Sequence, residues 1–247
     1  MTASPTARAA SLPVRIARQS LYETGAALRN GEQLLVTVLL PLLTLVGVHA
    51  SGLLDSPGRS GLDLAVPGVL ALAVVSSGFT ATAIATGFER RYDVLAALAT
   101  TPLGTGGLVA GKAVSVALLL LVQTALIGGT GLALGWRPDP AGLLPAGLAL
   151  VLGAAAFTAL GLLLAGTARP EATLALANLL WVLVGAVGGT VFPARWPALE
   201  LLPPGALGAA LRAGLTEGAW HPGALLVLVA WTALALLAAL RWFRWRP

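Results

Sequence analysis

Apolar residues in this chain are gathered into six long stretches that are separated by more polar intervals. Each stretch is close to the ~20 residues that a helix needs to cross the hydrocarbon core of a bilayer. None of them contains Asp, Glu, Lys or Arg. They cover residues 34–54, 64–87, 113–134, 143–165, 172–192 and 223–240. The pattern predicts an all-α polytopic membrane protein with six transmembrane helices, forming a single membrane domain over residues 1–247.

The residues before the first apolar stretch combine apolar and basic positions. Between residues 12 and 32 an apolar stripe recurs at helical spacing. The stripe consists of Val14, Ala17, Leu21, Gly25 and Leu28, and it is flanked by Arg15, Arg18 and Arg29. This predicts an amphipathic interfacial helix in the headgroup region of the membrane. A helix exposed to solvent remains the alternative.

A charged interval, residues 88–112, joins the second apolar stretch to the third and is called here the 88–112 segment. Its first part, 88–101, has apolar residues on one side of a helix and charged residues on the other. The apolar positions are Phe88, Tyr92, Leu95, Leu98 and Ala99, and the charged ones are Glu89, Arg90 and Asp93. We expect a short surface helix that offers its polar face to a partner and stops before Pro102.

Thr105 is expected to cap the next helix, and Lys112 to extend its ammonium group to the headgroups. A plain surface loop is the alternative.

The interval before the last apolar stretch, residues 193–222, is too apolar for an ordinary loop. Leu207, Leu211 and Leu215 recur at helical spacing after Pro203-Pro204-Gly205. We expect a re-entrant segment with a short helix half-immersed in the outer leaflet. A surface-lying hairpin with no gating role is the alternative.

Composition supports a membrane location and restricts the chemistry. The chain is 57% hydrophobic and 10% charged, whereas soluble domains carry about 25% charged residues. The net charge of +5 does not indicate nucleic-acid binding, because the arginines lie at the ends of the apolar stretches. Cysteine is missing, and His49 and His221 match no metal-ligand spacing, so we expect no metal site.

The distribution of basic residues predicts the orientation. With the N-terminus inside, eleven of the fifteen Lys and Arg residues fall in inner segments. The outer four are Arg59, Arg137, Arg195 and Arg212. We therefore expect a multi-pass protein of the plasma membrane with both termini in the cytoplasm.

Residues 106–112 read G-x-x-x-x-G-K, which is the skeleton of a phosphate-binding loop. Ala113 stands where a hydroxyl would bind magnesium, no buried strand precedes the glycines, and the following helix is a predicted span. We therefore interpret the match as coincidental, and expect this chain to have no catalytic residues and to bind no cofactor.

Three polar residues in the spans are candidates for a translocation path, because intramembrane polar groups usually face protein or water. They are Ser76 and Thr80 in the second span and Asn178 in the fifth. Ordinary helix packing is the alternative for all three. Packing is the preferred interpretation for Ser77 and Thr124.

The 88–112 segment resembles the signature of the type-2 exporter permeases of ATP-binding-cassette systems. The resemblance lies in Glu89-Arg90-Arg91-Tyr92-Asp93-Val94-Leu95, Leu98, Thr100-Thr101-Pro102-Leu103 and Gly111-Lys112. Those permeases commonly have Gly-Thr at the position of Asp93-Val94, and an acid at the position of Arg91. The amphipathic leader, the six spans and the apolar segment before the last span are similar as well.

The resemblance implies that the chain works as a pair beside two copies of a separate ATPase, which binds ATP and magnesium. It also implies that 88–101 is a coupling helix that docks into the ATPase. The residues this assigns to coupling are Glu89, Arg90, Arg91, Tyr92, Asp93, Leu95, Leu98, Thr101 and Pro102.

We therefore expect the permease subunit of an exporter for a hydrophobic or amphipathic substrate. Its partners would be the ATPase, a second permease copy and membrane lipid, and no nucleic acid. A scaffold or assembly subunit, and an intramembrane enzyme without recognisable motifs, are the alternatives. An intramembrane enzyme would need acid, base or metal groups, and a secondary carrier an ionisable group, deep inside the spans. No carboxylate, lysine, arginine or histidine lies deep inside an apolar stretch, since His49 is near the end of the first one.

Overall fold

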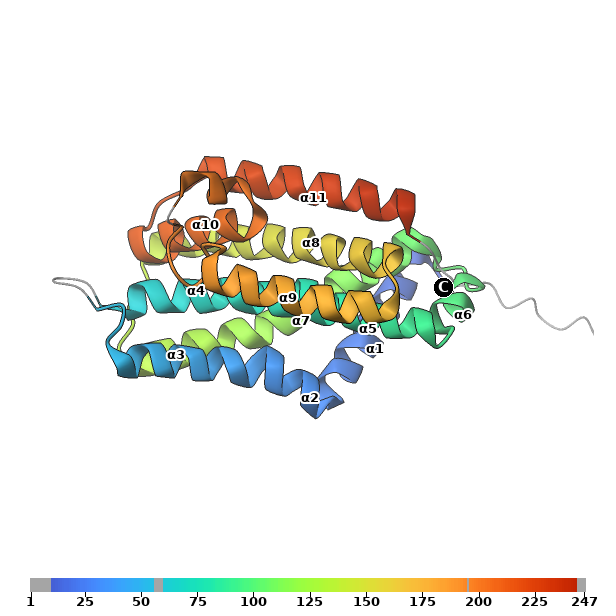
Figure 1. Cartoon of the computed structure of the whole chain (residues 1–247), viewed down its shortest axis with the longest axis horizontal. Coiled ribbons are helices and arrows are strands. Elements are labelled where there is room, and N and C mark those ends of the chain that lie inside the picture. The colour runs from blue at the N-terminus through green and yellow to red at the C-terminus, as the bar shows by residue number, and fades with distance from the viewer. Residues whose placement is uncertain (1–9, 56–59, 195, 244–247) are drawn as a thin grey trace, which may run out of the picture.

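The computed structural model of the protein describes residues 10–55, 60–194 and 196–243. Within these ranges the chain is helical and contains no strand, which confirms the all-α prediction. The long helices run side by side along one axis of an elongated bundle (Figure 1). Five of the basic residues counted for the orientation lie outside the described residues: Arg8, Arg59, Arg195, Arg244 and Arg246.

The chain begins with α1 (Leu12–Arg29), which packs against α7, and continues through α2 (Gly31–Leu34), a π-helical turn η1 (Leu35–Leu39) and α3 (Leu40–Ser51). Pro41 explains why the Thr37 carbonyl bonds a side chain. Because proline has no N–H, the carbonyl of Thr37 four residues earlier loses its helical donor. The side chain of Gln123 replaces that donor, with its Nε2 2.8 Å from the Thr37 oxygen.

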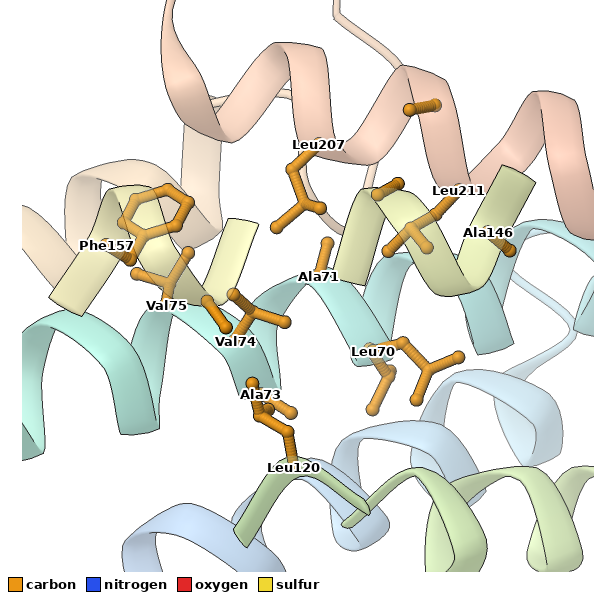
Figure 2. Close-up of a cluster of buried hydrophobic side chains, with 14 of the residues drawn as sticks. Leu70, Ala71, Ala73, Val74, Val75, Leu120, Ala146, Phe157, Leu207 and Leu211 are labelled. Atoms are coloured by element: carbon orange, nitrogen blue, oxygen red, sulfur yellow. The ribbon is translucent and has the colours of Figure 1, made fainter. Parts of the chain in front are cut away.

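The central helix is a continuous rod of α4 (Leu62–Val74), a second π-helical turn η2 (Val75–Ala81) and α5 (Thr82–Arg91). The hydroxyl of Thr82 donates to the Ser77 carbonyl over 3.0 Å, which satisfies an acceptor within the irregular turn. Side chains from α4 and η2 form the middle of the core. There Ala71 and Val74 lie on the side of α4 that faces Leu207 of the neighbouring α10 (Figure 2).

The remaining elements surround this rod. They are α6 (Val94–Ala99), α7 (Gly104–Ala133), η3 (Pro140–Gly142), α8 (Leu143–Thr167), α9 (Pro170–Val187), η4 (Pro197–Leu201), α10 (Pro203–Glu217) and α11 (Pro222–Trp242). Helix α8 packs closely on α11, α10 and η2. Gly161 permits this approach, because a Cβ there would lie 2.8 Å from the Phe79 carbonyl oxygen. Helix α9 packs mainly on α5 and leaves most of its surface exposed.

Five helices in the described part of the chain are long and apolar enough to cross a membrane. They are Leu62–Arg91, Gly106–Ala133, Pro140–Thr167, Pro170–Val187 and Pro222–Trp242. The first predicted span, 34–54, contributes a shorter apolar helix, Thr37–Ser51. The protein is therefore a multi-pass helical membrane protein.

Several boundaries differ from those predicted. The helix expected over 88–101 is divided, because the second span continues to Arg91 and a turn separates it from α6. The third span begins at Gly104 rather than near residue 113, which places Thr105 inside the helix instead of at its cap. The fifth helix ends at Val187 rather than 192, because Gly188 and Gly189 follow it and Gly189 has a φ of +78°.

The short helix predicted within 193–222 exists as α10, but it is not half-immersed at the surface. Leu207, Leu211 and Leu215 are all buried, and α10 packs against α4, α8 and α11. Small residues explain this position, because seven of its fifteen residues are Gly or Ala and allow neighbouring backbones to approach. At the closest point a Cβ added to Gly142 would overlap the carbonyl of Gly214.

Candidate functional site

The 88–112 segment lies at one end of the bundle, which is called here the α6 end. A small apolar cluster holds it together: Leu95 and Leu108 are fully buried and Leu103 nearly so. Ile16 from α1, Leu98 from α6 and Phe243 from the C-terminal end of α11 pack around this cluster. Helices α1, α6, α7 and α11 therefore meet at the α6 end, where both described ends of the chain also lie (Figure 1).

The turn between α5 and α6 has an unusual backbone conformation. Asp93 has a φ of +58°, in the left-handed region, and is the one non-glycine residue with a positive φ in the described ranges. Asp is tolerated there more readily than most residues, although glycine adopts this conformation at lower cost.

Arginine side chains connect the α6 end to neighbouring segments. Arg90 is buried and donates to the carbonyl of Ala168, in the connection between α8 and α9. Arg91 forms an exposed ion pair with Glu171 at the start of α9, with 2.8 Å between nitrogen and oxygen. Arg15 of α1 donates to the carbonyl of Pro102 after α6. The short helix α6 is thus attached on both sides.

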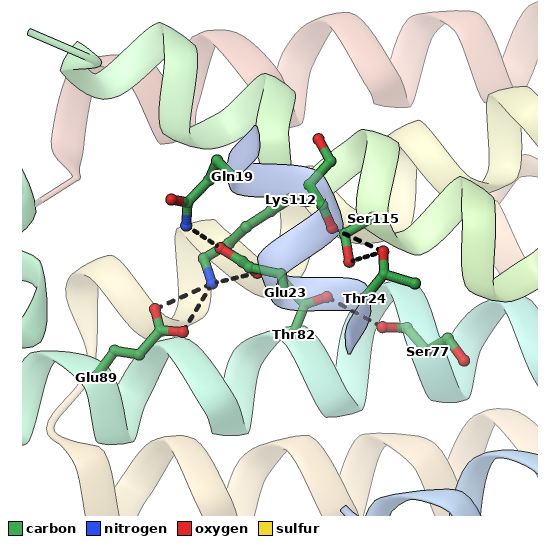
Figure 3. A network of polar contacts seen from close by, with 9 residues as sticks. Gln19, Glu23, Thr24, Ser77, Thr82, Glu89, Lys112 and Ser115 are labelled. Carbon is green, nitrogen blue, oxygen red and sulfur yellow. Dashed lines mark hydrogen bonds and ion pairs between the residues drawn. The ribbon is translucent and has the colours of Figure 1, made fainter. Parts of the chain in front are cut away.

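A buried ion cluster includes both ends of the 88–112 segment, and it joins three helices (Figure 3). The ammonium group of Lys112 on α7 lies 2.9 Å from a Glu23 oxygen on α1 and 3.0 Å from Glu89 on α5. Its side chain is only 3% exposed. Gln19 donates to Glu23 over 2.7 Å. Lys112 therefore does not extend to the headgroups as predicted, because two carboxylates inside the protein pair with it.

The structure places the predicted coupling residues in two groups. Some face inward or anchor the segment: Glu89, Arg90, Arg91, Leu95 and Leu98. The others are exposed around the two ends of α6: Tyr92, Asp93, Thr101 and Pro102. A partner approaching the α6 end would contact the second group directly. The first group would determine how α6 is held.

The sequence did not indicate Arg15, Glu23 or Glu171 as part of this site. Glu23 offered a usable signal, because it is an acidic residue in a helix flanked by arginines. An acid on the predicted membrane-surface helix and a lysine at the mouth of a span can pair when both lie at the same depth.

The candidate path residues do not share one surface. Ser76 is buried and accepts a hydrogen bond from Nε1 of Trp181 on α9 over 2.6 Å. Thr80 is buried, and its hydroxyl has no hydrogen-bond partner among the described residues. Asn178 is exposed on the outer surface of α9. Ser77 instead bonds Gln123 of α7, consistent with the packing role preferred for it.

The opposite end of the bundle contains a cavity of about 460 Å³. It lies between the end of α9 and η4, and its lining includes Phe192, Pro193, Trp196 and Leu199. Arg212 of α10 supports the connection after α9, because it donates to the carbonyls of Gly189 and Thr190 at 3.0 and 2.8 Å. This is the region predicted to form the outer re-entrant segment.

Residues 106–112 do not form a phosphate-binding loop. They lie within α7, so their backbone belongs to the helix, and the Lys112 ammonium is paired with carboxylates. Among the described residues, no group of three or more His, Cys, Asp or Glu side chains could hold a metal ion.

A bundle of several membrane-length helices, with a short helix held at one end by apolar packing and charge contacts, defines a multi-pass membrane protein. The family model described as ABC-2 type transporter matches residues 21–195. The chain belongs to this family of ATP-binding-cassette transporter membrane domains. No curated protein matches the sequence.

Proposed function

We propose that this chain is the permease subunit of an ATP-driven exporter, and that it carries a hydrophobic or amphipathic substrate outward across the plasma membrane. A separate ATP-binding-cassette ATPase would bind ATP and magnesium and dock at the α6 end. The observation that carries this proposal is the arrangement of α6. Its two ends are exposed, while Leu95 packs it into the apolar cluster, and arginine contacts hold the residues just before and after it.

This arrangement supports mechanical coupling because α6 cannot move by itself. A displacement of α6 by a docked ATPase would act on α5 and α7, which flank it in the chain. It would also act on α1 through the Arg15 contact and on the α8–α9 connection through Arg90. ATP binding and hydrolysis on the partner would thereby shift the bundle between inward-open and outward-open states.

The orientation in this proposal places the α6 end in the cytoplasm, with both termini. It counts Thr37–Ser51 and its helical extension as a sixth span. The membrane domain would then consist of an interfacial helix at 12–32, six spans, a coupling helix within 88–101 and a re-entrant segment at 193–222. The cavity near Trp196 would lie at the outer side, where it could open for substrate release.

A second permease copy would complete the transporter. Helix α9 supports this partner, because its exposed surface carries Leu179 and Val182 together with the polar Asn178. An amide is unfavourable against lipid and favourable against a protein or a water-filled path. Asn178, with Ser76 and Thr80 behind α9, would then lie close to the path between the two copies.

The experiment that tests this function is copurification with a cognate ATP-binding-cassette ATPase. The double variant Tyr92→Ala/Asp93→Asn removes an exposed ring and an exposed charge from the α6 end. We expect it to weaken ATPase binding about tenfold or more, as the loss of a central interface contact does. Binding is measured by titrating labelled ATPase onto permease in nanodiscs.

The matched control is the double variant Trp220→Ala/Glu217→Gln. It also removes an exposed aromatic ring and an exposed acid, but at the opposite end of the bundle. It should bind the ATPase as the wild type does. Equal loss in both doubles, or no ATPase binding by the wild type, would contradict the proposal and favour a scaffold or an enzyme.

A further inference from the structure

A groove of about 380 Å³ runs between α1 and α5, and α7 forms its floor. Its size falls within the range of small-molecule sites, about 300–1,000 Å³. The groove begins within the 88–112 segment at Tyr92 and Val94 and reaches Ser77 and Leu119 in the spans. It therefore connects the α6 end with the interior of the membrane domain.

Aromatic rings gather along this groove. The sequence has two tyrosines, and both line the groove. Tyr22 and Tyr92 are 74% and 69% exposed, although they come from helices far apart in the sequence. Phe88 also lines the groove and stacks on Tyr92, with 6.3 Å between ring centroids. Exposed ring faces attract cations through their negative electrostatic surface.

The charges of the groove favour a cation and disfavour an anion. The charged lining residues are Glu23, Glu89 and Lys112, which give a formal charge of −1. The Lys112 side chain is 3% exposed, whereas those of Glu23 and Glu89 are 16% and 26% exposed. The two carboxylates are therefore more accessible than the ammonium with which they pair. An anion would meet carboxylate oxygens and no accessible positive group of the lining.

The rest of the groove has no charged lining residue and combines apolar with neutral polar side chains. Ala81, Val116 and Leu119 line it together with Ser77, Thr82, Ser115, Asn30 and Gln33. A ligand that fits the whole groove has a positive end near the tyrosines and an uncharged, mainly apolar body along α7.

We infer that this groove binds an amphipathic organic cation, taken up from the cytoplasm or the inner leaflet, and that this class of molecule is the transported substrate. The assignment to transport rests on the proposed exporter function, whereas binding to the groove does not depend on it. Tyr22 and Tyr92 contact the cationic group, and Glu23 and Glu89 supply the complementary charge.

The test uses two probes of nearly the same shape and opposite charge, tetraphenylphosphonium and tetraphenylborate. Binding of each to the full chain in nanodiscs is measured by equilibrium dialysis, without any ATPase. Empty nanodiscs give the amount of each ion that dissolves in lipid. We expect saturable binding of tetraphenylphosphonium above this background, and none of tetraphenylborate.

Variants of Tyr22 locate the site, because this exposed side chain can change without disturbing the core. Tyr22→Leu should raise the dissociation constant for tetraphenylphosphonium about fivefold to tenfold, the effect of losing a cation–π contact. Tyr22→Phe keeps the ring and should bind within about twofold of the wild type. Trp220→Leu removes an exposed ring far from the groove and should not change binding.

Equal binding of the two ions, or equal binding by Tyr22→Leu and Tyr22→Phe, would overturn the inference. Either result would leave ATPase docking at α6 intact. Conversely, selective binding of tetraphenylphosphonium by a chain that no ATPase recognises would support the cation-binding groove and contradict the exporter function.

Discussion

The two ends of the bundle are held together by different kinds of contact. At the α6 end, charged side chains reach between segments, as Lys112 does to Glu23 and Glu89. At the opposite end, α10 is inserted between α4 and α8 and held mainly by close approach of backbones, although Arg212 also reaches from it to the connection after α9. The Thr216 hydroxyl donates to the Asp63 carbonyl over 2.6 Å, and the Asp139 amide donates to the Leu215 carbonyl over 3.2 Å.

This difference indicates which end can rearrange. Closely packed backbones lose many contacts at once when they separate, so the α10 end should move as a unit. Long charged side chains can keep their partners while the backbones shift. The α6 end is therefore suited to receiving a displacement from a partner.

The largest expected effect lies at the α10 end. Leu211 is fully buried, and the Ala and Gly residues nearby have no side-chain atoms that could fill the space that Leu211→Ala would leave. We expect a loss of about 4 kcal/mol in unfolding free energy. Thermal unfolding in detergent, followed by tryptophan fluorescence, measures it. The control Leu201→Ala changes an exposed leucine and should cost less than about 0.5 kcal/mol. Similar losses in both variants would contradict tight packing of α10.

The next effect concerns Lys112 at the α6 end. Lys112→Met leaves two partly buried carboxylates without a cation, and we expect a loss of about 3 kcal/mol. The triple variant Lys112→Met/Glu23→Gln/Glu89→Gln removes the unpaired charges and should recover much of this loss. The same unfolding measurement compares them. A triple variant less stable than the single one would show that the charges do not act as a cluster.

A smaller effect is expected at the turn before α6. Asp93→Val places a β-branched residue at a φ of +58° and should cost about 1–2 kcal/mol. Asp93→Gly suits this backbone and should leave stability nearly unchanged, since glycine also loses more entropy on folding. Unfolding of both variants should therefore separate backbone strain from loss of the carboxylate. Equal destabilisation would assign the effect to the carboxylate.

The smallest effect is expected for the exposed pair Arg91–Glu171. Its side chains are 49% and 68% exposed, so Arg91→Glu should reduce stability by less than about 1 kcal/mol. The swapped double variant Arg91→Glu/Glu171→Arg should restore it, and the difference should shrink at high salt. Unfolding at two salt concentrations tests this. An effect as large as that of Lys112→Met would mean that the α6 end depends on surface charge.

The sequence pattern predicted the helical fold and most spans, because an unbroken apolar stretch of bilayer length has few other structures available. It located the 88–112 segment for the same reason. The pattern failed where two apolar environments had to be distinguished. The leucines of α10 have the same spacing whether the helix faces lipid or protein, so periodicity could not show that Leu207 and Leu211 are buried inside the bundle.

The periodicity of the sequence also could not predict the turn at Asp93 or the polar contacts at the α6 end. The spacing of Phe88, Tyr92 and Leu95 fits a continuous helix, but the left-handed turn at Asp93 divides it. The partners of Lys112 come from residues 23 and 89, and their meeting depends on how α1 packs on α7. Such a three-dimensional coincidence leaves no periodic trace in one sequence.

The π-helical turn η2 has a consequence for how this chain tolerates insertions and deletions. A helix advances about 100° per residue, so removing one residue between Val75 and Ala81 would rotate everything beyond it by that angle. Glu89 would then turn away from Lys112, and Arg90 from the α8–α9 connection, although no charged residue had changed. The number of residues in this rod determines the direction in which the charged residues at its end point, whereas the number of residues in a peripheral loop does not.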